Sequence, residues 1–469
     1  WLAVIHHKLW GEHEFFGKIF RTANLTEHYF KELQDLLDIE NPGRTSDSYV
    51  AKNVLANKAD FLRKKSEPLK TDFGNGPAPR LVFDATQPPS SGVVGNDAVS
   101  DDDDGDDAMD IDPNHGYADS HTDHLSNEAT AIFPYTIRYV DLTLLNLKME
   151  LRVPLLMLFR NEWGSMIDIF NTRTHLKGIR GSAFLTGQPG IGKTCLLYSI
   201  LILCMIRGQR FVFQDVDGKV FIIDDAGVTT SGQARAVSGD EILTLVDADA
   251  RCCEPNYYLL NNSRHRILLT SSPRTNKDRW WLKQYSSQNA VFTMGPWSRE
   301  EFVVATLFLQ MTDITLKRLQ QASLICGNIP RPCFEAAASH TDLREAEKVI
   351  RNAIKQTEDL FKVDSKMQNG DNSHITHRAF QVRPELSENR FWHSSVAEPV
   401  SAWAFMEMLN VLHKRGRGEA YRFYCKIKGY RGSCQLCGKM FEYYLHPYLK
   451  PSRTFIIKSL DNHAATLKI

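Results

Sequence analysis

A glycine-rich octapeptide in the middle of the chain has the residue types and spacing of a phosphate-binding loop. It fits G-x-x-x-x-G-K-[ST] at every fixed position and consists of Gly187, Gln188, Pro189, Gly190, Ile191, Gly192, Lys193 and Thr194. Glycines allow backbone conformations in which successive N–H groups converge on an anion. The lysine would bring a positive charge to the β- and γ-phosphates, and the threonine hydroxyl would be a ligand for Mg²⁺. The pattern predicts a site for ATP or GTP with Mg²⁺, and no base-reading motif distinguishes the two nucleotides.

The segments on either side of this loop favour the same interpretation. Residues 182–186 (SAFLT) form a short apolar run that is typical of a buried strand, and residues 195–207 read as a hydrophobic helix. The N-terminus of such a helix would add its partial positive charge at the point where the phosphates bind. We therefore expect a strand, the loop and a helix in this order.

A magnesium-dependent phosphate site also needs a carboxylate at the end of a neighbouring strand, and two candidates exist. Asp247 follows the apolar run ILTLV, whereas Asp224 and Asp225 follow the run FII. The pair Asp217-Gly218 between two apolar runs predicts a hairpin, which would place Asp224 on the return strand. Asp247 is the preferred acid, although both patterns satisfy the same coarse rule.

Polar residues also follow the next predicted strand, residues 266–270 (RILLT). Ser271 and Ser272 at its end could sense a γ-phosphate or orient water, although serine is also common in ordinary turns. Further along, Ser298 followed three residues later by Glu301 forms a capping box that should open a helix.

The alternation of short apolar runs with helical patterns indicates an α/β fold with a mainly parallel sheet. We expect six segments along the chain: a small, mainly helical unit at 1–84, an acidic disordered linker at 85–130, the α/β core at 131–297, a helical lid at 298–363 with a break at 327–332, a linker or loop at 364–390, and a small α/β unit at 391–469.

The composition excludes some classes of protein. Lys plus Arg and Asp plus Glu are both 56 of 469 residues, so the net charge is zero and the chain is not a globally basic nucleic-acid binder. Nine scattered cysteines indicate reduced thiols, which suggests an intracellular location in the cytoplasm or nucleus. No run approaches the roughly 18 apolar residues of a membrane-spanning helix.

One cysteine pair near the C-terminus raises the question of a zinc site. Cys434 and Cys437 form a single C-x-x-C, whereas structural zinc sites are usually built from two such pairs. Free thiols are therefore the preferred interpretation. Nearby, Glu442 and His446 have the i, i+4 spacing of one helix face.

With these motifs in hand, residues 153–334 resemble the P-loop NTPase module of Crinkler-type and retrotransposon-hot-spot-type proteins, within the STAND- and AAA-like group. The pieces that carry the resemblance are Val153-Pro154, Arg160-Asn161-Glu162, GQPGIGKT at 187–194, LVDAD at 245–249, LLTSSP at 268–273, MGPWSREE at 294–301 and GNIPR at 327–331. The resemblance implies a parallel sheet of strand order 5-1-4-3-2 with helices on both faces and a helical lid.

The resemblance also implies roles for individual residues. Asp247 would be the acid of the magnesium shell, and Ser271 or Ser272 would be the sensor at the strand end. Arg274 and Arg331 would be candidate cations facing the γ-phosphate. Either arginine could equally be a surface residue.

In one position the sequence departs from the family pattern. Many related ATPases carry a water-activating glutamate after the acidic strand, whereas Ala248 and Asp249 stand here, and Asp249 is the candidate for that role. Three functions follow as expectations: a magnesium-dependent ATPase acting as a nucleotide-driven switch on a protein partner, a scaffold that binds nucleotide without hydrolysis, or an effector that acts on nucleic acid. The last rests on family analogy alone.

Overall fold

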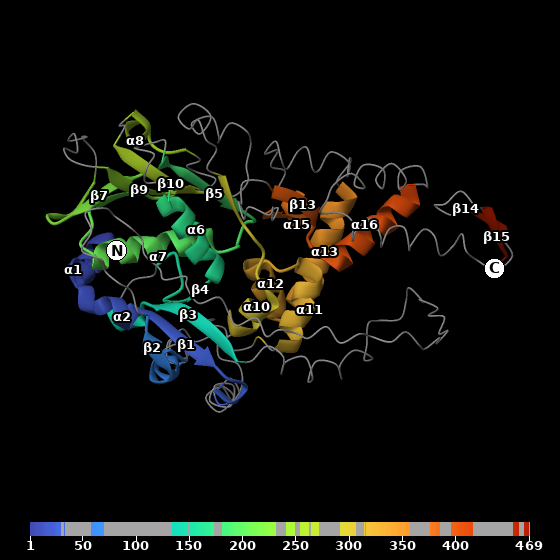
Figure 1. The fold of residues 1–469 in the computed structure, drawn as a ribbon, viewed down its shortest axis with the longest axis horizontal. Coiled ribbons are helices and arrows are strands. Elements are labelled where there is room, and N and C mark those ends of the chain that lie inside the picture. Colours follow the sequence, from blue (N-terminus) through green and yellow to red (C-terminus); the bar gives the residue numbers. More distant parts are fainter. Residues whose placement is uncertain are drawn as a thin grey trace.

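The computed structural model describes the parts of the chain that form the fold shown in Figure 1. These are residues 1–29, 32, 58–69, 134–147, 151–172, 181–230, 241–248, 254–261, 264–271, 291–305, 314, 316–356, 376–384, 395–415, 454–458 and 464–468. The acidic stretch at 85–130 and the cysteine pair Cys434 and Cys437, with Glu442 and His446, lie outside them.

A seven-stranded, largely parallel sheet forms the centre of the molecule. Its order is β11-β5-β10-β9-β6-β7-β8. The five parallel strands are β5 (Ala183–Gly187), β6 (Phe211–Gln214), β9 (Ile242–Asp247), β10 (His265–Thr270) and β11 (Val291–Met294). Numbered along the chain, these five strands have the expected order 5-1-4-3-2. Every residue of β5, β9 and β10 is buried, which explains why these strands read as continuous apolar runs.

Two antiparallel strands, β7 (Val220–Asp224) and β8 (Gly227–Thr230), extend one edge of this sheet. The tight turn before β7 contains Gly218 with φ +79°, and Phe211 of β6 pairs with Ile223. The predicted hairpin is therefore confirmed. Because β7 runs antiparallel to the five parallel strands, Asp224 lies at the end of the sheet where those strands begin. Asp247 lies at the opposite end, where they finish.

Helices cover both faces of the sheet, as expected. On one face lie α7 (Lys193–Ile206), α6 (Asn161–Thr172) and α1 (Leu2–Leu9), and on the other lies α8 (Tyr257–Asn261). Side chains of β9 alternate between these layers, since Leu243 and Leu245 pack on the α7 side and Ile242 and Val246 on the α8 side. Helix α7 is buried almost all round because the N-terminal segment covers it.

A second, antiparallel sheet lies on the side of α7 that faces away from the central sheet (Figure 1). Its order is β2-β1-β3-β4, formed by β1 (Phe20–Leu25), β2 (Ser66–Pro68), β3 (Tyr135–Asp141) and β4 (Leu156–Phe159). Short helices accompany it at His13–Phe15, Phe16–Ile19 and Thr143–Leu145. The sequence indicated a mainly helical unit before residue 85, but β1 pairs along its whole length with β3, on the far side of the acidic stretch. Pairing between such distant segments leaves no local pattern in the sequence.

A helical region adjoins the β11 edge of the central sheet (Figure 1). It contains α10 (Arg299–Ala305), α11 (Leu316–Cys326), α12 (Pro330–Ala337), α13 (His340–Gln356) and α16 (Ala402–Arg415). The expected capping box is confirmed at α10: the Glu301 amide donates to Ser298 Oγ (3.2 Å), and the Ser298 amide donates to Glu301 Oε2 (2.9 Å). In the described part of the chain, no helix is both long and apolar enough to cross a bilayer.

The segment expected as a linker at 364–390 contains regular structure. Residues 376–384 form α15 (Thr376–Ala379) and β12 (Phe380–Pro384), and β12 pairs with β13 (Ser395–Pro399) beside β11. A further hairpin consists of β14 (Thr454–Lys458) and β15 (Ala464–Lys468). The sequence did not indicate β12, because its partner β13 comes later in the chain.

Candidate functional site

The loop between β5 and α7 has a backbone that requires its glycines. Gly187, Gly190 and Gly192 have φ values of +146°, +84° and +109°, which L side chains rarely adopt. A Cβ at Gly187 would lie 2.9 Å from the Met294 oxygen, and one at Gly190 would lie 2.6 Å from Arg331 Cβ. Gly192 is the N-cap of α7. The loop therefore curves between a buried strand and a helix N-terminus, as predicted.

Lys193 folds back over this loop. Its Nζ donates hydrogen bonds to the backbone oxygens of Gly187 (2.7 Å) and Gln188 (2.9 Å), and the residue is only 8% exposed. Carbonyl oxygens hold the ammonium in the concave side of the loop, where phosphate oxygens would be alternative acceptors for the same protons.

Of the two candidate acids, the fold brings Asp247 to the loop. Thr194 Oγ1 donates to Asp247 Oδ1 at 3.3 Å, and Asp247 is 4% exposed at the carboxyl end of β9. At the opposite end of the strands, the Asp224 backbone oxygen accepts a hydrogen bond from His6 Nε2 (2.9 Å). The direction of β7 thus decides between two aspartates that look alike in the sequence.

Thr270 is part of this polar cluster, although sequence reasoning missed it. Its Oγ1 lies 3.4 Å from both Asp247 Oδ1 and the Val246 backbone oxygen, either of which can accept its proton. The side chains meet because Thr270 and Asp247 are directly paired in the parallel register of β10 and β9. The sequence pointed one or two residues further, to Ser271 or Ser272; Ser271 is buried at the end of β10 and its amide donates to the Leu185 oxygen. A hydroxyl as the last residue of a predicted strand was the signal that could have identified Thr270.

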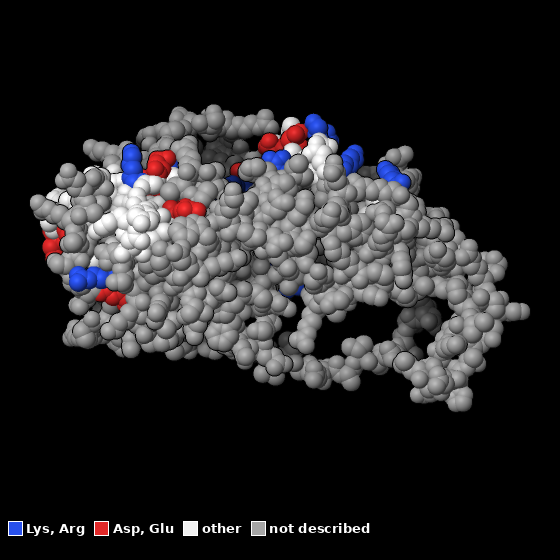
Figure 2. Space-filling model, turned by 90° about the horizontal axis from the view of Figure 1, so that it is seen from above, with Lys and Arg blue, Asp and Glu red and all other residues white. Residues whose placement is uncertain are grey.

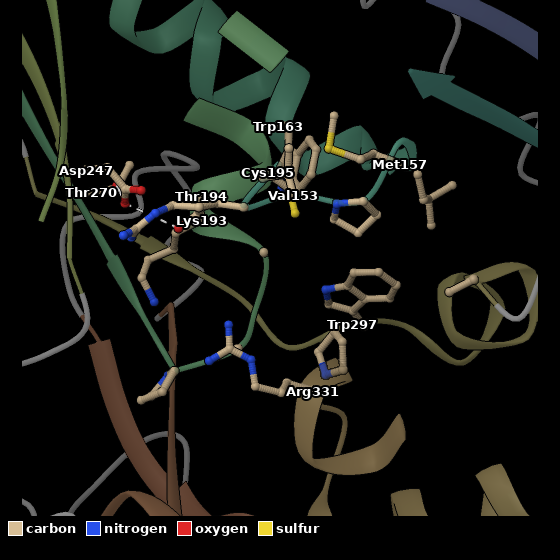
Figure 3. A pocket seen from close by; sticks show the side chains of 18 of the residues that line it. Val153, Met157, Trp163, Lys193, Thr194, Cys195, Asp247, Thr270, Trp297 and Arg331 are labelled. Atoms are coloured by element: carbon tan, nitrogen blue, oxygen red, sulfur yellow. Dashed lines mark hydrogen bonds between the residues drawn. The ribbon is translucent and has the colours of Figure 1, made fainter. Parts of the chain in front are cut away.

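Arg331 approaches the loop from the first turn of α12. This helix follows a turn at Gly327, where φ is +71° and a Cβ would lie 1.8 Å from the Val400 oxygen. Figure 3 shows the Arg331 side chain extending towards the loop, on the same side of the cavity as Lys193. The other predicted site residues, Asp249, Ser272 and Arg274, lie outside the described part of the chain.

These side chains line a cavity of about 530 Å³ with two chemically different ends. Its polar end is formed by Lys193, Thr194, Asp247 and Thr270, and its apolar end by Val153, Met157 and Trp297; the lining also includes Arg152, Pro154, Trp163, Arg331 and Phe334. Figure 3 shows the labelled residues of the two groups on different sides of the same space. Trp297 is fixed by a hydrogen bond from its Nε1 to the Ile191 oxygen (2.9 Å).

A buried ionic network supports the wall next to Trp297. Arg160 donates to both carboxylate oxygens of Glu301 (2.9 and 3.0 Å) and to the backbone oxygens of Gly295 and Pro296 (3.1 Å each). Glu162 Oε2 lies 2.7 Å from Arg160 Nη1, and Glu162 Oε1 accepts the Gly295 amide (2.7 Å). Burial raises the pKa of Glu162 from 4.5 to about 7, against the opposing effect of Arg160. The network fixes the exit of β11 relative to α6 and α10.

Cys195, the residue after the loop threonine, also lines the cavity. Burial, together with the nearby Asp247 carboxylate, raises the pKa of its thiol to about 12. Cys195 is therefore a neutral thiol at physiological pH and not an activated nucleophile.

Charged side chains on the described surface are mixed in sign. In the view of Figure 2, both Lys or Arg and Asp or Glu side chains are visible among the residues that are coloured. This agrees with the zero net charge of the chain.

Comparison with known proteins leaves the assignment at the level of the fold. No protein-family model matches the sequence, and no curated protein matches it. The chain is an α/β protein with a mostly parallel central sheet.

Proposed function

We propose that this protein binds a nucleoside triphosphate with Mg²⁺, with the phosphates held by residues 187–194. The observation that carries the proposal is the meeting of Lys193, Thr194 and Asp247 at the N-terminus of α7, at one end of a cavity large enough for a nucleotide. The strand order 5-1-4-3-2 supports it further, because it agrees with the P-loop NTPase fold that the sequence resembles.

The loop offers a phosphate group two kinds of attraction. Glycine conformations and the α7 N-terminus provide backbone N–H groups with partial positive charge. The Lys193 ammonium, bonded to two loop carbonyls, would exchange those acceptors for phosphate oxygens, which form stronger charge-assisted hydrogen bonds. Arg331 adds a second cation from α12.

The residues beside the loop fit a magnesium ion. Mg²⁺ usually takes one or two carboxylates and completes its octahedron with phosphate oxygens and water. Thr194 and Asp247 would supply one hydroxyl and one carboxylate from adjacent positions. Bound there, the ion would neutralise charge on the phosphates.

The apolar end of the cavity would receive the base. Phe334 comes from α12 and Trp297 from the connection between β11 and α10, whereas Val153, Pro154 and Met157 precede the loop, so the base would contact the helical region as well as the segment before the loop. Large aromatic and aliphatic walls favour a planar purine by stacking and burial. This arrangement gives the helical region contacts that depend on nucleotide, as a switch requires.

The second candidate function is a nucleotide-binding scaffold without hydrolysis. The observation that favours it is Ala248, which follows Asp247, is 6% exposed and donates its amide to the Thr270 oxygen. Position 248 therefore supplies no carboxylate to activate water. An effector that acts on nucleic acid rests on the resemblance, and the mixed surface charge lends it no support.

Direct titration of the full chain with ATP and with GTP, with and without Mg²⁺, tests the proposal. Lys193→Ala should weaken binding by about 10- to 100-fold, because it removes a charged hydrogen-bond donor. Asp247→Asn should abolish most of the effect of Mg²⁺, whereas the matched variant Asp224→Asn should leave it intact. Equal binding by all four proteins would refute the site, and phosphate release from the wild type separates the switch from the scaffold.

A further inference from the structure

The Gln188 side chain forms hydrogen bonds with a segment almost 200 residues later in the chain. Its Nε2 donates to the backbone oxygens of His377 (2.6 Å) and Phe380 (3.0 Å), and its Oε1 accepts the Val382 amide (3.3 Å). Gln188 is 2% exposed. A buried carboxamide that pairs both its donors and its acceptor is held in one geometry. The second residue of the loop is therefore bonded to α15 and β12.

The same segment is also linked, through Val400, to the turn that precedes the helix carrying Arg331. The Val400 amide donates to the Ala379 oxygen (2.9 Å), and the Val400 oxygen lies against Gly327, at the turn before α12. Beside it, Ser401 Oγ donates to the Ile325 oxygen (2.8 Å) at the end of α11. Residues 376–384 and 395–401 thus connect the loop to the turn that precedes α12, and both the loop and α12 contribute residues to the lining of the cavity.

We propose that Gln188 is a positioning residue that couples the loop to β12. Nucleotide binding then stabilises residues 376–384, and the bonds of Gln188 to those residues strengthen nucleotide binding. This inference rests on the proposed function. In the described structure the Lys193 ammonium is bonded to the Gln188 backbone oxygen. Transfer of that ammonium to phosphate would change the restraint on Gln188, whose side chain is fixed to β12. Coupling of this kind is reciprocal, so loss of the Gln188 bonds must also weaken nucleotide binding.

Hydrogen exchange of the full chain tests this coupling. Saturating ATP with Mg²⁺, or a non-hydrolysable analogue, should slow exchange of the amides in 376–384 by about five-fold or more. Gln188→Leu, which keeps the size but removes the hydrogen bonds, should lower ATP affinity and abolish this nucleotide-dependent slowing. Gln381→Leu is the matched control, since Gln381 lies on the same strand but bonds Glu398 of β13 (2.9 Å), and it should retain the slowing.

The outcomes separate this inference from the proposed function. If titration shows that ATP binds the wild type but exchange at 376–384 is unchanged, the coupling is refuted and the nucleotide site stands. If neither ATP nor GTP binds the wild type, both are refuted. The wild-type comparison needs no variant, so a folding defect of Gln188→Leu would not protect the inference from a negative result.

Discussion

Replacement of Gly190 by alanine probes the close approach between the loop and α12. The residue has φ +84°, and an added Cβ would lie 2.6 Å from Arg331 Cβ, well inside the 3.4 Å of ordinary contact. A left-handed conformation costs an alanine about 1–2 kcal/mol. Overpacking against another Cβ, which no rotamer change can relieve, adds about 1–3 kcal/mol. Gly190→Ala should therefore reduce the free energy of unfolding by about 2–5 kcal/mol.

Gly11→Ala separates the two contributions. Gly11 has a similar φ of +71°, but an added Cβ would meet nothing within 4 Å. This control should lose only the backbone part, about 1–2 kcal/mol. Urea unfolding followed by tryptophan fluorescence measures both variants, and ATP titration shows whether the loop is affected. Equal losses of stability in the two variants would refute the packing argument, and unchanged ATP affinity in Gly190→Ala would refute the phosphate role of the loop.

Two further predictions concern the ionic network. Because the folded pKa of Glu162 is raised to about 7, the folded state holds a proton that the unfolded state releases near 4.5, so stability should fall as pH rises between these values. Glu162→Gln should flatten that part of a urea-unfolding series against pH, and an unchanged slope would contradict the assignment. Arg160→Ala should cost about 3–5 kcal/mol, since it leaves two buried carboxylates without their partner. The surface variant Lys348→Ala should cost less than about 1 kcal/mol in the same assay, and similar losses would show that the Arg160 network is not structurally important.

Several features of the fold were readable in the sequence because the interactions that produce them are local. The loop at 187–194 needs glycines within a few residues of one another, and the capping box at Ser298 spans three residues. The hairpin before Asp224 depends on a Gly218 turn. A buried parallel strand is apolar throughout, so even the alternation of strands and helices, and with it the α/β class, was visible.

Tertiary structure decided the features that depend on strand direction and on distant pairing. The choice of Asp247 over Asp224 required the knowledge that β7 runs antiparallel, because both aspartates end similar apolar runs. Thr270 joined the site through its register with Asp247. The pairing of β1 with β3 crosses the acidic stretch, and Gln188 binds backbone groups that no side-chain pattern could reveal. The roles of Asp249, Ser272 and Arg274 remain predictions, because these residues lie outside the described part of the chain and their chemistry depends on neighbours that folding supplies.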